Sequence, residues 1–326
     1  MKVKHLVILL IVIIGGIVGA FSYYFLDYSR TPFKTLPTYN ANRELSDLTF
    51  LYSYGNNEGS ELELKMPLNL ALDASGNSYV VDNGDSQIKV YDAKGTYMYS
   101  IGSPGTEEGE LLAPAGIAYH NGFVYVTEPT LGSIQAFEMN GTYSHTLVKE
   151  SKENRYSPVG IKVTKDNTIM FTDVAGHRII EINDKGEELF SFGRPGSGEG
   201  EFSYPHDLVL DSQERIYVAD SNNGRIQVFE RNGTYLFQID GSLNENMNFA
   251  LPRGIAIDSF NRLIVVDTLA NQIRFFELNG EPMFEYGDRG SDDGLLNFPN
   301  GVIVEGNKIF IADRENNRIQ VFSPAM

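Results

Sequence analysis

Cysteine and tryptophan are both missing from the 326 residues of this chain. Without cysteine there is no disulfide, no thiolate metal ligand, no cysteine nucleophile and no lipidated cysteine. Helical periodicity is missing after residue 30, which argues against a mainly helical domain. Basic residues are too few to balance the acidic ones, and the formal net charge is −17. Such a surface repels phosphate backbones and no local basic patch interrupts it, so we expect no nucleic-acid partner.

The N-terminal region contains one long apolar run. Residues 6–26 are uncharged and follow Lys2 and Lys4. At ~1.5 Å per residue, a helix of this length spans a hydrocarbon core of ~30 Å, and lysines on the short side favour a cytoplasmic N-terminus. A cleaved signal peptide is the alternative, because Val18-Gly19-Ala20 offers a cleavage site. The apolar run continues past Ala20, so we favour an uncleaved signal anchor, and both interpretations export the domain.

These features predict four segments. Residues 1–5 form a cytoplasmic N-terminus, and residues 6–26 form a transmembrane signal anchor that makes the chain a single-pass membrane protein. Residues 27–45 contain two prolines and no alternating pattern, and they form a linker. Residues 46–326 form the folded domain on the extracytoplasmic side.

Six copies of one β unit fill the folded domain. Each copy begins with a proline, and consecutive prolines stand 44 or 47 residues apart. The prolines are Pro67, Pro114, Pro158, Pro205, Pro252 and Pro299. A first apolar strand follows each proline, and a second strand ends in an acid: Asp82, Glu128, Asp173, Asp220, Asp267 and Asp313. A third strand starts five residues after the acid, and a weaker fourth strand follows a hairpin turn such as Asn232-Gly233.

This repeat predicts an all-β fold, a six-bladed β-propeller of four-stranded antiparallel blades. Units of this size cannot bury a hydrophobic face alone, so they pack radially. The sixth copy ends after RIQVF at 318–322 and lacks a fourth strand. Residues 48–55, LTFLYSYG, match fourth strands elsewhere, for example LFSFG at 189–193. We therefore expect the N-terminal strand to complete the last blade and close the ring.

The sequence of copies four to six resembles NHL repeats. PHDLVLDSQERIYVADSNNGRIQVF at 205–229 and PNGVIVEGNKIFIADRENNRIQVF at 299–322 are similar to the family pattern of Pro-x-Gly-aliphatic, aliphatic-Tyr-Val-Ala-Asp and Asn-x-Arg-Ile-Gln-x-Phe. The resemblance covers residues 48–322 and is weaker in copies one to three. It implies a six-bladed propeller but no single activity, because such propellers serve as protein- and RNA-binding modules, sensor ectodomains and occasionally enzymes.

Strand direction identifies the face of the ring where a ligand would bind. In an up-and-down blade, the loop before the first strand and the loop between strands two and three lie at the same end, so the residues after each proline surround the channel mouth. Polar residues concentrate there in copies four, five, six and one. The candidate ligand-binding residues are His206, Asp207, Arg253, Asn300 and Asn69, with His177 from a two-three loop. The alternative is that these loop residues vary and meet water.

Metal-dependent chemistry is the main alternative function. The resemblance includes peptidyl-hydroxyglycine amidating lyases, which hold zinc with three histidines, and gluconolactonase-type propellers, which hold calcium. Of five histidines, only His206 and His177 are expected at the mouth, because His120 lies in a turn at the opposite end and His145 on an outer strand. A three-histidine zinc site is therefore not available, whereas calcium would need several oxygen ligands from the same half-ring.

The strand-end acids are interpreted as loop supports and not as metal ligands, because an acid recurs in every copy. Each would accept from loop amides and from the residue five positions later. Those residues are Gln87, Ser133, Arg178, Arg225, Gln272 and Arg318.

Together these features predict a membrane-anchored, extracytoplasmic propeller that binds a protein, peptide or glycan as a scaffold or sensor module. No catalytic residue, metal site or cofactor is predicted for this function. The alternative is a lyase or lactonase-type enzyme that uses zinc or calcium in the central channel.

Overall fold

The computed structural model describes residues 48–56, 59–60, 62–149, 155–240 and 248–324. Contacts divide the chain into two units, Met1–Glu44 and Leu45–Met326, and all described residues belong to the second. The predicted anchor at 6–26 and the linker at 27–45 lie outside the described residues. Within the described part of the chain, no helix is long and apolar enough to cross a membrane.

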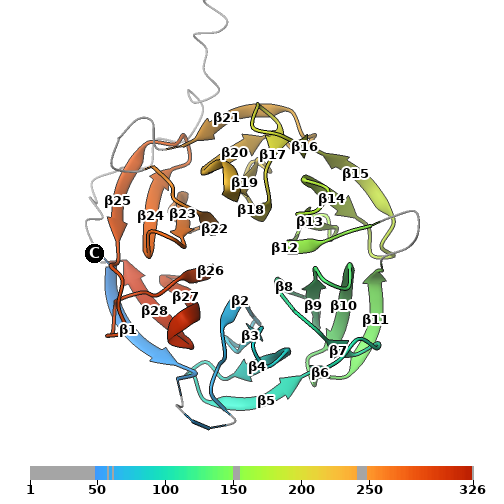
Figure 1. Ribbon diagram of the computed structural model, residues 1–326, viewed down its shortest axis with the longest axis vertical. Helices are drawn as coiled ribbons and strands as arrows, with labels where there is room; N and C mark the ends of the chain where they lie inside the picture. Colours follow the sequence, from blue (N-terminus) through green and yellow to red (C-terminus); the bar gives the residue numbers. More distant parts are fainter. Residues whose placement is uncertain (1–47, 57–58, 61, 150–154, 241–247, 325–326) are drawn as a thin grey trace, which may run out of the picture. The chain divides into compact units, whose positions relative to one another are not determined.

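Six four-stranded antiparallel sheets, the blades, surround a common axis (Figure 1). The innermost strands are β2 (Pro67–Leu72), β8 (Ile117–His120), β12 (Pro158–Val163), β18 (Pro205–Leu210), β22 (Pro252–Ile257) and β26 (Pro299–Glu305). The second strands are β3 (Ser78–Asp82), β9 (Phe123–Glu128), β13 (Ile169–Asp173), β19 (Ile216–Asp220), β23 (Arg262–Asp267) and β27 (Lys308–Asp313). We number the blades 1 to 6 in the order of these strands.

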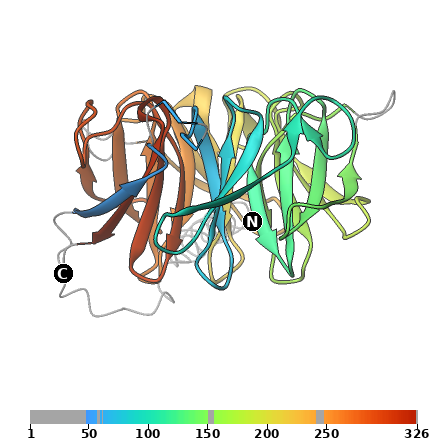
Figure 2. The same cartoon turned by 90° about the horizontal axis from the view of Figure 1, so that it is seen from below.

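The outer half of each blade continues the same antiparallel order. The third strands are β4 (Gln87–Tyr91), β10 (Ser133–Glu138), β14 (Arg178–Ile182), β20 (Arg225–Phe229), β24 (Gln272–Glu277) and β28 (Arg318–Pro324). The outermost strands are β5 (Tyr97–Ile101), β11 (Tyr143–Val148), β15 (Glu188–Phe192), β21 (Tyr235–Ile239), β25 (Pro282–Tyr286) and β1 (Leu48–Tyr54). The predicted six-bladed, four-stranded architecture is confirmed, and Figure 2 shows the strands running between the two faces of the ring.

The N-terminal strand closes the ring, as the sequence predicts. β1 pairs antiparallel with β28, and the Cα partners run from Leu48 opposite Pro324 to Tyr54 opposite Ile319. In the sheet of blade 6, with the order β1-β28-β27-β26, β1 takes the place of the fourth strand. The two ends of the propeller sequence therefore share one blade. Pairing with β1 covers the outer edge of β28, which would otherwise be exposed.

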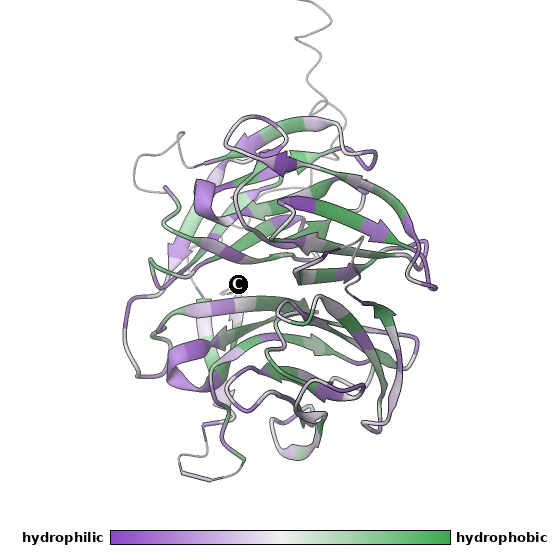
Figure 3. Cartoon of the chain, turned by 45° about the vertical axis from the view of Figure 1, so that its right-hand side comes forward, coloured by the Kyte–Doolittle hydropathy of each residue, from purple (hydrophilic) through white to green (hydrophobic). Residues whose placement is uncertain are grey.

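The hydrophobic core consists of six clusters, each built from two neighbouring blades. Tyr217 and Val228 of blade 4 pack with Leu263 and Phe276 of blade 5 in one of them. Each large apolar side chain buried in this way contributes about 1.5–3 kcal/mol to folding. The second strand β19 is buried along its whole length, which is typical of a strand covered on both faces. Figure 3 shows hydrophobic residues in green along the strands, interspersed with hydrophilic residues in purple.

Short elements connect the blades. The glycine-rich segments that the sequence identifies as connectors contain two parallel two-residue pairs, β6 (Ser103–Pro104) with β7 (Glu110–Leu111) and β16 (Arg194–Pro195) with β17 (Glu201–Phe202). Two 3-10 turns, η2 (Ser221–Asn223) and η4 (Arg314–Asn316), follow the second strands of blades 4 and 6. These elements gather at the end of the ring where the innermost strands begin.

Candidate functional site

The mouth face is the side of the ring where the six prolines introduce the innermost strands. The loop before each first strand meets the loop between strands two and three there. In blade 4, the Asn222 amide donates to the Ser203 carbonyl at 3.0 Å, and in blade 5 the Thr268 amide donates to the Leu251 carbonyl at 3.0 Å. This arrangement confirms the placement that strand direction predicts.

Two rows of residues follow the prolines around the mouth. The first row is Leu68, Ala115, Val159, His206, Arg253 and Asn300. The second row is Asn69, Gly116, Gly160, Asp207, Gly254 and Gly301. The first row is apolar in blades 1 to 3 and polar in blades 4 to 6, so the mouth has two chemically different halves.

The second row is where neighbouring innermost strands come closest. A Cβ at Gly116 would stand 1.9 Å from the Val159 carbonyl oxygen, and a Cβ at Gly254 would stand 2.4 Å from that of Asn300. Four of the six copies therefore have glycine at this position. Asn69 and Asp207 are the exceptions, and both are buried, with 9% and 1% of their surface exposed.

Asp207 links three blades and does not open toward a ligand. Its Oδ1 accepts from the Leu208 amide at 2.9 Å, and its Oδ2 accepts from the Ile255 amide of blade 5 at 3.2 Å. Lys162 of blade 3 lies 3.5 Å from Oδ1. Burial raises the pKa of Asp207, while Lys162 and the two amides oppose that rise. The contacts of Asp207 are those of an interblade support.

Asn69 makes the equivalent local bond in blade 1, where its Oδ1 accepts from the Leu70 amide at 2.8 Å. Together with Asp207, it fills the second row at the two places where glycine is absent. Both residues are buried next to the first row, and their side chains bond to backbone amides of the innermost strands.

Arg253 and Asn300 are brought together in the first row. In the orientation that satisfies both of its amide atoms, Asn300 accepts from Arg253 Nη1 at 2.8 Å and donates to the Leu68 carbonyl at 3.1 Å. Burial lowers the pKa of Arg253, and the nearby positive charge of Arg314 lowers it further. Within the described residues, no carboxylate forms an ion pair with Arg253. Asn300 therefore holds a guanidinium whose charge has no carboxylate partner.

His206 stands beside Arg253 in the same half of the mouth. Its side chain keeps part of its surface accessible but is surrounded by protein atoms. That burial, together with the charge of Arg253, lowers the pKa of His206 to about 3. The imidazole is therefore neutral at physiological pH, with one nitrogen that donates and one that accepts.

Arg314 is a mouth residue that the sequence analysis missed. It is the first residue after the strand-end acid, where blades 1, 4 and 5 have short donors that reach the next blade, whereas blades 2 and 3 have Pro129 and Val174. Asn83 donates to the Pro114 carbonyl at 3.0 Å, and Thr268 donates to the Pro299 carbonyl at 2.8 Å. The Nε of Arg314 lies 3.6 Å from Glu315 in a long ion pair, and this buried nitrogen has no hydrogen-bond partner among the described residues. Comparison of this position between copies is the signal that could have identified it.

His177 lies on the mouth face but makes its contacts at a blade junction. Its Nδ1 accepts from the Tyr204 amide at 3.2 Å, and the two rings meet edge to face at 5.4 Å. Asn271 makes the matching bond to the Phe298 amide at 2.8 Å, and Asn317 makes it to the Met66 amide at 3.0 Å. His177 therefore occupies a recurring structural position that joins blade 3 to blade 4.

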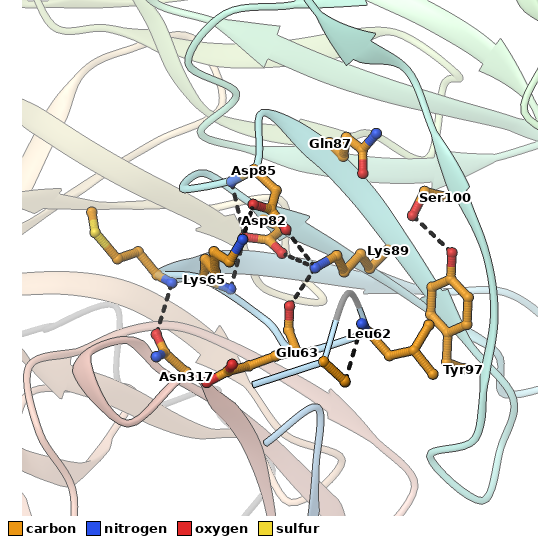
Figure 4. Close-up of polar contacts among 12 residues, drawn as sticks. Leu62, Glu63, Lys65, Asp82, Asp85, Gln87, Lys89, Tyr97, Ser100 and Asn317 are labelled. Atoms are coloured by element: carbon orange, nitrogen blue, oxygen red, sulfur yellow. Dashed lines mark hydrogen bonds and ion pairs between the residues drawn. The ribbon is translucent and has the colours of Figure 1, made fainter. Parts of the chain in front are cut away.

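All six strand-end acids are fully buried and accept from loop amides, as the sequence predicts. Figure 4 shows the cluster in blade 1, where Asp82 accepts from the Lys65 amide at 2.9 Å and pairs with Lys89 at 2.8 Å. Lys89 also contacts Asp85 and the Glu63 carbonyl, so its buried ammonium is fully satisfied. These acids support loops.

The basic partner of the acid is predicted correctly in three blades only. Arg178, Arg225 and Arg318 bond to their acids through Nε at 2.8–3.0 Å. In blades 1 and 5 the prediction that Gln87 and Gln272 are the partners of the acid is wrong. The ion-pair partners are Lys89 and Arg274, which stand seven residues after the acid. The residues five and seven positions after the acid are the first and third residues of the third strand. Their side chains point to the same side of the sheet, so either can reach the acid.

Glu128 in blade 2 has no cation at either position. Its Oε2 accepts from the Leu112 and Ala113 amides at 3.2 and 3.0 Å, while its buried Oε1 has no hydrogen-bond partner among the residues that the structure describes. Burial raises the pKa of Glu128 to about 7, against the smaller opposing effect of the two amides. Its protonation state therefore changes near neutral pH.

Below the mouth, the innermost strands of blades 1, 2, 3 and 6 line a cavity of about 250 Å³. Its lining combines apolar side chains such as Tyr119, Ile161 and Ile303 with the polar His120 and Lys162. His120 Nε2 is buried without a partner among the described residues. His120 ends β8 and His145 lies on β11, both away from the mouth, as predicted. Across the described ranges, no group of three or more His, Cys, Asp or Glu could hold a metal ion.

Comparison with known proteins identifies the repeat. The NHL repeat family model matches residues 202–229 and 296–322, the copies with the most regular motifs. The chain is an NHL-repeat propeller. NHL repeat-containing protein 3 of Mus musculus is 24% identical over 239 residues, which cover 64% of this chain and 65% of that protein. The human protein of the same name is 35% identical over 78 residues, 23% of this chain and 22% of the relative.

The NHL propeller also resembles named enzymes. A probable peptidyl-alpha-hydroxyglycine alpha-amidating lyase of Caenorhabditis elegans is 30% identical over 96 residues, 28% of this chain and 27% of that protein. These alignments span less than two thirds of each relative. Virginiamycin B lyase from Staphylococcus aureus has a TM-score of 0.59 at 17% identity, over 85% of this chain and 99% of that one. A gluconolactonase from Xanthomonas campestris has a TM-score of 0.62 at 15% identity, over 80% and 87%. At such identity the likeness concerns the fold.

Proposed function

We propose that this NHL propeller is a binding module whose protein partner docks on the mouth face. The observation that carries the proposal is the polar half of the first row, where Arg253 lies beside His206 and, within the part of the chain that the structure describes, has no carboxylate partner. Exposed apolar side chains accompany it on the same face: Leu112, Tyr204 and Leu269 are 41%, 53% and 51% exposed. Apolar contacts around a central charged anchor are typical of protein interfaces.

Site-specific photocrosslinking tests the docking face. A benzoylphenylalanine at Leu112 or Leu269 reports on the mouth face. The matched control positions are Met98 on β5 and Leu189 on β15, which are 50% and 53% exposed on the outside of the ring. We expect the full-length protein to capture a partner in cells from the first pair only. Capture from the outer pair alone, or equally from all four, contradicts docking on the mouth face, and a captured glycan would replace the protein partner.

We further propose that residues 6–26 anchor the chain and that the propeller lies on the extracytoplasmic side. The support is the uncharged apolar run after Lys2 and Lys4. The chain has no cysteine, so one cysteine placed at the exposed Asn140 gives a clean probe. Labelling by a membrane-impermeant maleimide in intact cells is the expected result, and labelling only after lysis contradicts the proposed location.

A metal-dependent lyase or lactonase is the second candidate. The amidating-lyase relative supports it, as do the named activities of propellers with a similar fold, and the channel below the mouth holds a cavity. Elemental analysis of full-length protein purified without chelator separates the two functions. Stoichiometric zinc or calcium favours the enzyme, whereas protein without either metal favours the binding module.

A further inference from the structure

We propose that the mouth recognises a carboxylate group of the protein partner, held by Arg253 with Arg314 beside it. This inference rests on the proposed docking of a partner on the mouth face. It adds the chemistry of recognition and the residues that carry it.

The first observation is the unusual charge state of Arg253. Buried arginines of the propeller lie close to carboxylates: Arg215 faces Asp211, Arg225 faces Asp220 and Arg318 faces Asp313, at 2.6–2.8 Å. The half-buried Arg253 bonds to the neutral Asn300 and has no carboxylate partner among the described residues. A charge that is partly removed from water and has no counter-charge destabilises the fold. An anion from a partner would therefore compensate the charge of the Arg253 guanidinium.

The second observation is independent of the first. Arg314 stands where blades 1, 4 and 5 have a short donor that bonds to the next blade, and its buried Nε has no hydrogen-bond partner among the described residues. Blade 6 therefore has a guanidinium in place of that bond, and its charge acts on Arg253. Arg314 also forms a long ion pair with Glu315 at 3.6 Å, so it adds a partly compensated positive charge to this side of the mouth in a chain with a net charge of −17.

A carboxylate fits this half-ring better than a polyanion does. Two guanidinium groups match one small anion, and the acidic body repels an extended phosphate backbone. The planar guanidinium fork binds a carboxylate through two parallel N–H bonds. Neutral His206 adds one uncharged donor. Across the mouth, Leu68, Ala115 and Val159 offer apolar contact for a side chain that neighbours the carboxylate.

Peptide arrays test the proposal with full-length protein. One array carries random hexapeptides with free C-terminal carboxylates, a second the same peptides as C-terminal amides, and a third the same amides with one phosphoserine. Within each array, peptides that contain an internal Asp or Glu are compared with peptides that contain neither. We expect binding only by peptides that carry a carboxylate at the end or in a side chain. Arg253→Gln should weaken that binding about tenfold or more, the loss expected for one charge-assisted bond.

Arg289→Gln is the matched control, because Arg289 also lies on the mouth face without an ion pair among the described residues and stacks over Phe298 at 5.8 Å. It removes the same charge and should change binding less than about twofold. Arg253→Lys should restore part of the affinity. Equal binding of neutral peptides, a preference for phosphoserine, or wild-type binding by Arg253→Gln overturns the carboxylate. If mouth-face crosslinks to a partner persist in Arg253→Gln, docking stands and the carboxylate is wrong.

Discussion

At the scale of single residues, Glu128 is the strand-end acid whose charge meets no cation. The folded state raises its pKa from an ordinary 4.5 to about 7, so folding favours the protonated form. Stability should therefore be highest below pH 4.5 with respect to this group and should fall as the pH rises toward 7. Glu128→Gln keeps the oxygen that accepts from the Leu112 and Ala113 amides and removes the titration.

We compare the unfolding free energy of Glu128→Gln with that of wild type at two pH values. The difference should favour the variant by about 1–3 kcal/mol more at pH 8 than at pH 5. Denaturant titrations at the two pH values provide the measurement. Asp220→Asn is the control, because Arg225 pairs with Asp220 and the amide should destabilise the protein at pH 8. The same gain for Glu128→Gln at both pH values would show that Glu128 is ionised in the folded state throughout.

Arg314 gives a second prediction at the residue scale. Arg314→Thr installs the side chain that blade 5 has at this position, where Thr268 donates to the Pro299 carbonyl. We expect it to form the missing bond from blade 6 to blade 1 and to raise the unfolding free energy by about 0.5–1.5 kcal/mol. Partner binding at the mouth should weaken in the same variant. A less stable protein with unchanged binding would assign Arg314 a structural role.

At the scale of elements, the pairing of β1 with β28 closes the ring. The absence of cysteine allows this pairing to be tested by a designed disulfide between Thr49 and Ser323, which are Cα partners in the two strands. In Thr49→Cys/Ser323→Cys, we expect oxidation to stabilise the propeller by about 2–5 kcal/mol, because the bridge encloses nearly the whole ring. Thermal unfolding with and without reductant measures it. The single variant Thr49→Cys should show no such difference, and failure of the double variant to form the bridge would contradict the register.

The strands and their order could be predicted from sequence, because they depend on a local pattern repeated six times. LTFLYSYG at 48–55 could be matched to fourth strands because it follows the same alternation as LFSFG. The partners of the acids could be predicted only partly. Asp267 pairs with Arg274 and not with Gln272. Both residues lie on the same side of the third strand, so the spacing in the sequence does not predict which of them contacts the acid.

At the scale of the whole molecule, the mouth face could be located from strand direction, whereas its chemistry depends on contacts between blades. The sequence predicts Asp207 as a ligand-binding residue, yet its carboxylate accepts from the Ile255 amide and lies 3.5 Å from Lys162 of the adjoining blades. The position of His177 in a two-three loop predicts a residue at the mouth, but its imidazole accepts from the Tyr204 amide at a blade junction. Arg314 lies far from Arg253 in sequence, and the packing of blade 5 against blade 6 brings the two charges near each other.

The central claim is that blades 4 to 6 keep an uncompensated charge at the mouth for a partner. The most direct test measures the stability and partner binding of Arg253→Gln in one preparation of full-length protein. We expect an unfolding free energy equal to or above wild type, because a half-buried charge with no carboxylate partner among the described residues is removed, together with loss of partner capture by benzoylphenylalanine at Leu269. A destabilised variant that still captures its partner would contradict the account and leave Arg253 as a structural residue.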